Sequence, residues 1–242
     1  MRRAALFPIL LMILMVAVDA GAQGLDLRIG GFLPRTRDCG IPSSQPAEYT
    51  LFQDVCELYA VDQNAFDGVY GGIEYSHVVA KNVEASIHLD GYSKTVDTFY
   101  RDYERPGNGG NIFQTLRLRT APLGVSLRFV PTSKRAKIAP FVGGGVDAVF
   151  YEYEEFGDFI DFFDPDLPIY GDHFVDDGVA FGLHAFGGLR IYVNRDFAIV
   201  GEARYMWAAT DMGDDFAPTE PGFVNRIDLS GWTWTVGVHV RF

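Results

Sequence analysis

Eight stretches of this sequence alternate apolar and polar residues, and this pattern constrains the fold more than any other feature. A period of two is the signature of a β-strand with one apolar and one polar face. In the last stretch, "GWTWTVGVHVRF", tryptophan, valine and finally Phe242 occupy every second position. The eight stretches cover residues 25–33, 68–76, 83–94, 114–129, 140–153, 179–193, 197–207 and 231–242.

The links between these stretches are alternately long and short. The three short links are rich in Asn, Pro, Ser and charged residues, which favour turns, and no change of composition suggests a domain boundary after residue 22. We therefore predict an all-β fold in which residues 23–242 form one eight-stranded antiparallel up-and-down β-barrel. The four long links lie near residues 34–66, 98–112, 154–178 and 208–226.

The fourth stretch changes its alternation part-way along. Leu116 and Leu118 have one parity, while the apolar residues from Leu123 onward have the other. Such a change is typical of a β-bulge, and a residue such as Pro122 is tolerated there. A β-bulge is therefore expected near residues 120–122.

Residues 1–22 bear on which solvent the barrel faces. They combine a basic start, an apolar run of about fifteen residues and the small residues Ala20 and Ala22, which is the pattern of a cleaved signal peptide rather than of a membrane helix. An exported barrel can lie in a bilayer with its apolar face toward lipid, so we predict a transmembrane barrel. Aromatic residues suited to the membrane interfaces lie near the predicted strand ends: Tyr75, Trp207, Trp232 and Trp234.

In a transmembrane barrel, the polar face of each strand lines the interior. Eight strands leave an interior that side chains just fill, and charges are tolerated there when they pair with one another. We expect a buried polar plug with Glu202 and Arg204 at its centre, and a gated ion path is the alternative. The predicted lumen network comprises Arg28, Glu74, Glu84, His88, Asp90, Asp147, Arg190, Glu202 and Arg204.

The two cysteines of the chain, Cys39 and Cys56, both lie in the first long link. In an oxidising compartment they are expected to form a disulfide. Half of a zinc site is the alternative, although no histidine lies nearby to complete it.

The third long link is strongly acidic and rich in phenylalanine. Carboxylate oxygens suit Ca²⁺ or Mg²⁺, although the spacing differs from that of a calcium-binding hand. A solvated acidic surface over the barrel mouth is the alternative. The candidate cation ligands are Asp158, Asp161, Asp164 and Asp166.

A net charge of −12 disfavours a nucleic-acid partner. An enzyme would need a nucleophile or an activated water beside a base at the outer rim. Of the five histidines, only His173 lies in a predicted outer loop, and no serine is near it in sequence. We therefore expect no enzymatic activity, and no cofactor is implied.

The terminal stretch resembles the last strand of outer-membrane β-barrel proteins, which usually ends on Phe. The segments "LRIGGFLPR", "APLGVSLRFVP" and "GGLRIYVNRDFAIVGEARYMW" are similar to those of small eight-stranded OmpA/OmpW-like barrels, and the resemblance covers residues 23–242. It implies the outer membrane of a Gram-negative bacterium, contact with lipid and lipopolysaccharide, and delivery by periplasmic chaperones to the barrel-assembly machinery. The residues implied in that last recognition are Trp234, Val236, Val238, Val240 and Phe242.

The resemblance leaves the activity open, because one architecture hosts many functions. The favoured function is a non-enzymatic barrel that supports envelope integrity or makes surface contacts through its extracellular loops. The alternatives are a narrow channel for small apolar or ionic solutes and, less favoured, a lipid A-modifying enzyme. The oligomeric state stays open.

Overall fold

The computed structural model describes residues 23–35, 50–107, 109–132, 136–213, 216 and 225–242. Within these ranges, no helix has both the length and the apolar composition needed to cross a membrane. The helix is α2 (Leu51–Leu58), and the strands are β1 (Gln23–Pro34), β2 (Gly68–Ala80), β3 (Val83–Glu104), β4 (Asn111–Phe129), β5 (Ile138–Ile160), β6 (Ile169–Tyr192), β7 (Phe197–Asp211), β8 (Arg226–Asp228) and β9 (Gly231–Arg241).

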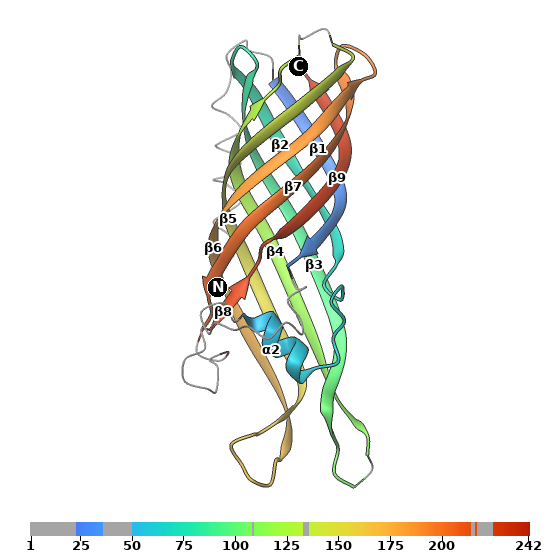
Figure 1. Cartoon of the computed structure of the whole chain (residues 1–242), viewed down its shortest axis with the longest axis vertical. Helices are drawn as coiled ribbons and strands as arrows, with labels where there is room; N and C mark the ends of the chain where they lie inside the picture. The colour runs from blue at the N-terminus through green and yellow to red at the C-terminus, as the bar shows by residue number, and fades with distance from the viewer. Residues whose placement is uncertain (1–22, 36–49, 108, 133–135, 214–215, 217–224) are drawn as a thin grey trace.

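Eight of the strands form a closed ring (Figure 1). Strands β1 to β7 pair antiparallel in sequence order, and β9 closes the ring by pairing with both β7 and β1. At the seam, the backbone amides of Gln23 and Phe242 each donate to the other's carbonyl oxygen, at 3.1 and 3.0 Å. The short strand β8 pairs with the end of β7. The predicted eight-stranded antiparallel up-and-down barrel is confirmed.

The barrel turns its apolar side chains outward and its polar side chains inward. On β4, Leu127 is 61% exposed whereas its neighbour Arg128 is 1% exposed. On β9, Val236 and Val238 are likewise exposed while Thr235 is buried. This is the reverse of a water-soluble barrel and is the arrangement that a lipid bilayer requires. The predicted transmembrane orientation is therefore confirmed.

The two ends of the barrel differ. The end that carries Gln23 and Phe242, here called the termini end, has the short connections. One of them is the tight turn at Lys81 and Asn82, where Asn82 adopts a left-handed φ of 66°, a conformation that Asn tolerates better than most residues. The opposite end, here called the hairpin end, carries α2 and the long β3–β4 and β5–β6 hairpins (Figure 1).

Two of the predicted long loops are mostly strand. The β3 strand continues to Glu104, and β5 and β6 stay paired as far as Ile160 and Ile169. The loop predictions for residues 98–112 and 154–178 are therefore wrong. Both segments are polar in composition because their outer faces meet water. Each connection is reduced to a turn. In the β5–β6 turn, the Asp161 amide donates a hydrogen bond to the Pro168 carbonyl oxygen at 3.0 Å.

The predicted β-bulge near residues 120–122 is also wrong. Thr120 and Leu123 keep one register with β3, and Pro122 keeps one register with β5. Instead, the environment of β4 changes near these residues. Leu116 and Leu118 point inward to an apolar cluster, whereas the residues from Leu123 to Phe129 that have the opposite parity face lipid.

An apolar cluster closes the hairpin end of the barrel, and we call it the cap. Helix α2 supplies its amphipathic face, and the Thr50 amide donates to Gln53 Oε1 at 2.9 Å at the start of this helix, as in a capping box. The helix was missed within the predicted loop because eight residues are too few to form a stable helix without tertiary packing. The cap includes Phe32, Leu51, Phe52, Val55, Tyr59, Phe66, Tyr92, Leu116, Leu118, Tyr153, Ile227 and Leu229.

Candidate functional site

Two arginines and three carboxylates interlock in the middle of the lumen. Arg28 lies 2.8 Å from Glu202, 3.0 Å from Asp90 and 3.0 Å from Glu74. Arg204 lies 2.9 Å from Glu202 and 3.3 Å from Glu74. Because the five residues come from β1, β2, β3 and β7, their ion pairs cross the barrel interior and join its walls.

Arg128 of β4 adds a third guanidinium to this group. Its Nη2 contacts Glu74 and also Glu202, the latter at 3.4 Å. Its guanidinium carbon lies 4.4 Å from the ring centre of Phe141 and 5.3 Å from that of Phe186. Aromatic faces stabilise a cation most strongly where water is excluded, so Arg128 is held by both charge and stacking.

A second ionic group lies toward the termini end. Arg190 is 2.8 Å from Glu84 and 3.4 Å from Asp26, and His239 Nδ1 contacts Asp26 from β9. A cavity of about 450 Å³ lies beyond this group, lined in part by Glu84, His239 and Arg241. The lumen is thus filled in its middle and hollow near the termini end.

The structure brings all nine predicted lumen residues to the barrel interior. Glu202 and Arg204 lie in the central group, as expected from the sequence. Four further members were missed, although each occupies the inward parity of its strand, so the alternation alone could have found them. The missed residues are Asp26, Arg128, His184 and His239.

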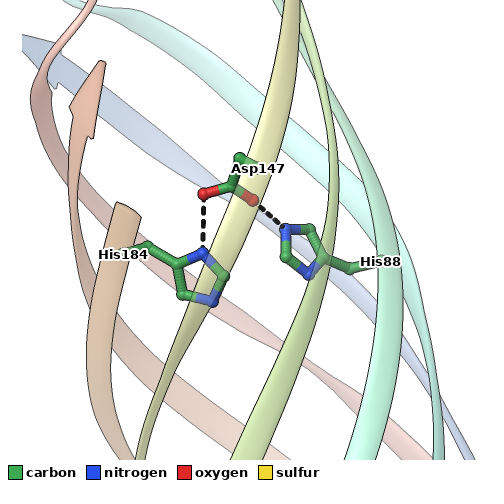
Figure 2. Close-up of side chains that lie close together, drawn as sticks. All are labelled: His88, Asp147 and His184. Atoms are coloured by element: carbon green, nitrogen blue, oxygen red, sulfur yellow. Dashed lines mark hydrogen bonds and ion pairs between the residues drawn. The ribbon is translucent and has the colours of Figure 1, made fainter. Parts of the chain in front are cut away.

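Asp147 holds two histidines inside the barrel (Figure 2). Its carboxylate lies between them, with Oδ1 3.0 Å from His88 Nε2 and Oδ2 2.6 Å from His184 Nδ1. Ser126 Oγ lies 2.9 Å from the other nitrogen of His184, Nε2. His88 Nε2 is also 2.9 Å from a guanidinium nitrogen of Arg204.

Ser126, His184 and Asp147 have the order of a nucleophile, a base and an orienting carboxylate. All three are buried in the barrel. The cavity beside Asp147 measures about 10 Å³, which is room for one water molecule. An acyl or glycosyl substrate does not fit there, so we assign this arrangement no hydrolytic role.

A buried carboxyl group also lies under α2, beyond the membrane-spanning part of β5. Glu155 accepts hydrogen bonds from the hydroxyls of Tyr153 and Tyr59, at 2.7 and 3.2 Å. Burial raises the pKa of Glu155 to about 7, and the two tyrosine hydroxyls only partly oppose this shift. The cap therefore contains a group that titrates near neutral pH.

The predicted cation ligands are spread along the β5–β6 hairpin. Asp158 pairs with Arg105 of the neighbouring hairpin. Asp161 and Asp164 accept backbone amide hydrogen bonds within the turn, at 2.9 and 3.0 Å. In the described part of the chain, these three carboxylates and Asp166 do not converge on a common point as metal ligands do.

The fold has counterparts among solved structures. Neisserial surface protein A superimposes with a TM-score of 0.50 at 10% identity, over 92% of this chain and 98% of that one. OprG from Pseudomonas aeruginosa superimposes with a TM-score of 0.52 at 12% identity, over 92% and 96%. No protein-family model matches the sequence, and no curated protein does so either. The chain has the outer-membrane β-barrel fold.

The outer surface of this outer-membrane barrel fold carries aromatic residues at both rims. Near the hairpin end, Tyr205 packs on Trp207 and Trp232 with ring centres 4.7 and 5.0 Å apart, and Trp234 stacks on Trp232 at 5.8 Å. Tyr75 pairs with a β1 residue close to the termini end. These are the positions at which girdles contact lipid headgroups.

The terminal strand β9 lines the same lipid-facing surface. Trp234, Val236, Val238 and Phe242 are exposed and Val240 is half-buried. Their recognition by the barrel-assembly machinery stays a prediction. Cys56 is buried on α2, while Cys39 and the predicted signal peptide lie outside the described residues, so the disulfide and the cleavage also stay predictions.

Proposed function

We propose that this protein is a non-enzymatic barrel of a Gram-negative outer membrane, which makes surface contacts and supports the envelope through its hairpin end. Export by residues 1–22 and assembly with periplasmic chaperones and the barrel-assembly machinery belong to this proposal. Outer-membrane lipid and lipopolysaccharide are its proposed partners along the barrel wall. The hairpin end would then face the cell exterior and the termini end the periplasm.

Closure of the lumen is the observation that carries this proposal. The central ionic group of Arg28, Arg128 and Arg204 with their carboxylates fills the middle of the barrel. The cap then covers the hairpin end. A solute would have to pass both barriers, and opening the first would leave several buried charges without partners.

Planar-bilayer recordings test this closure. Purified barrel is expected to give no stepwise conductance over a range of salts, voltages and pH values. Phe52→Ala, which weakens only the cap, is expected to stay silent because the ionic group remains in place. Reproducible conductance steps from the unaltered protein would contradict the proposal and favour the channel for small solutes.

The tip of the β5–β6 hairpin supports a role in surface contacts. Phe163 is 83% exposed there, and Phe162 and Leu167 are also exposed. Asp164 and Asp166 lie beside them in the turn. Phe162 also packs on Tyr103 with ring centres 5.3 Å apart, so Phe163 is the freer of the two rings. Contiguous exposed apolar groups of this kind mark interaction sites.

Replacing both phenylalanines of this tip by serine is expected to reduce adhesion. Cells that express the Phe162→Ser/Phe163→Ser variant should be retained several-fold less on polystyrene, an apolar test surface, than cells that express the unaltered barrel. The matched control is Val193→Ser, which removes an exposed apolar side chain at the termini end. Equal retention of the tip variant, at equal amounts of folded barrel, would contradict a contact role for this hairpin.

A further inference from the structure

Asp147 differs from the other buried carboxylates of the lumen in the charge it faces. Asp26, Glu74, Asp90 and Glu202 each contact at least one arginine. The hydrogen-bond partners of Asp147 within the described residues are two imidazoles, and the carboxylate is only 4% exposed. A carboxylate buried this deeply needs a compensating positive charge.

We propose that His88, Asp147 and His184 bind one divalent transition-metal ion, with Zn²⁺ the expected occupant. The candidate ligand atoms all lie within 4.8 Å of one another. Zinc–ligand bonds of roughly 2.0–2.2 Å place tetrahedral ligand atoms about 3.3 Å apart. The present contacts, 3.0 Å to Oδ1 and 2.6 Å to Oδ2, therefore have to widen by about 0.3 and 0.7 Å, and any ligand atoms near the 4.8 Å limit have to approach. Two imidazoles and a carboxylate form a set of ligands that suits zinc better than calcium or magnesium, which take oxygen ligands.

Ser126 orients one of these ligands. When Nδ1 of His184 binds a metal, its Nε2 must carry the proton, and Ser126 Oγ lies 2.9 Å from that nitrogen as an acceptor. A hydrogen bond from the far nitrogen of a ligating histidine fixes its tautomer and ring orientation. The serine thus fits a supporting role better than a nucleophilic one.

A fourth ligand has a place beside the group. The cavity of about 10 Å³ is lined by His88, Asp147 and Arg204, among others, and its size matches one water molecule. Three protein ligands and one water make a four-coordinate zinc site. Arg204 would then release His88 and keep its contacts with Glu202 at 2.9 Å and Glu74 at 3.3 Å.

The charge of the lumen leaves room for a cation. Six carboxylates face five guanidiniums, which leaves one negative charge if the three histidines are neutral. A bound cation would compensate it, and the competing solution is a proton on a histidine. The carboxylates are Asp26, Glu74, Glu84, Asp90, Asp147 and Glu202, and the guanidiniums are those of Arg28, Arg128, Arg190, Arg204 and Arg241.

Gly124 provides space for this site. A Cβ atom at this position would lie 2.1 Å from Asp147 Oδ1 and 2.5 Å from a carbon of the His88 ring. A methyl group would therefore push both ligands aside. Gly124→Ala leaves every ligand in the chain but is expected to disturb their convergence.

Metal content of the refolded barrel tests the proposal. The full mature chain is refolded in detergent with excess Zn²⁺, freed of unbound metal by gel filtration and analysed by elemental mass spectrometry. We expect one zinc per folded chain, with at least a tenfold loss in His88→Ala, His184→Ala and Gly124→Ala. Co²⁺ should give a tetrahedral visible absorption band in the unaltered protein and lose it in these variants.

Two controls keep the outcome decisive. His239→Ala removes a buried histidine that belongs to the Asp26 pair, and His173→Ala removes an exposed one, so both should retain the metal. Folding is checked by heat-modifiable migration on a gel. Folded unaltered barrel that binds less than about a tenth of an equivalent of zinc overturns the proposal in favour of protonated histidines. Full binding that persists in folded His88→Ala and His184→Ala overturns it as well.

Discussion

Replacing Arg128 by alanine is expected to lower the free energy of unfolding by about 3–5 kcal/mol, because it removes one of the three guanidiniums that compensate the buried carboxylates. Arg128 contacts Glu74 and Glu202 and stacks on Phe141. The truncation therefore removes both the charge and the aromatic contact from a site that water does not reach. The measurement is urea unfolding in detergent, followed through the folded and unfolded bands on a gel.

Arg119→Ala is the matched control. Arg119 also pairs with two glutamates, Glu152 and Glu154, but its side chain is nearly half exposed on the outer face of the hairpin end. A pair of this kind contributes less than about 1 kcal/mol. Equal destabilisation by the two substitutions would show that the lumen charges are not the groups that hold the barrel walls together.

Protection of the α2 amides is expected to fall as the pH rises from about 4.5 to 7. Burial raises the pKa of Glu155 to about 7 from an ordinary value of 4.5, so the closed cap favours the protonated carboxyl. Below pH 4.5 the group is neutral whether the cap is open or closed, and the cap has its full stability. Between the two values the closed cap progressively loses up to roughly 3 kcal/mol, and above pH 7 the loss is constant.

Hydrogen exchange of α2, expressed as protection factors, measures this loss. Glu155→Gln keeps the size of the side chain and its contacts with Tyr59 and Tyr153, and should make the protection independent of pH. Glu57→Gln changes an exposed glutamate on the same helix and should keep the original pH dependence. A pH profile that survives in Glu155→Gln would assign the effect to another group.

The sequence predicts the barrel wall well because one local rule governs it. In the membrane, every strand shows lipid one face and the lumen the other, so a period of two identifies both the strand and the direction of each side chain. This is why residues as far apart in the chain as Arg28 and Glu202 could be assigned to one interior. Their pairing partners could not be predicted, because these depend on how strands stagger around the ring.

The hairpin end escaped prediction because a different rule applies there. Glu155 points inward from a segment whose composition resembles that of a loop. Its burial depends on α2, and the helix in turn depends on the barrel mouth for its apolar partners. Neither the inward direction of this part of β5 nor helix α2 can be predicted from one segment alone, since each forms only when the other is in place.

The outer face of β4 changes from arginine to apolar residues along the strand, and this change also fixes how deep the barrel sits in the bilayer. Sinking by two residues, roughly 5 Å along the membrane normal for a tilted strand, would draw Arg119 into the edge of the hydrocarbon. The cost is about 0–1 kcal/mol there and rises toward roughly 2–4 kcal/mol at the midplane. Rising by the same step would strip lipid from Leu123, the lipid-facing leucine of β4 nearest the hairpin end. The molecule is therefore anchored vertically by its own strands, and a membrane of different thickness must adapt to it.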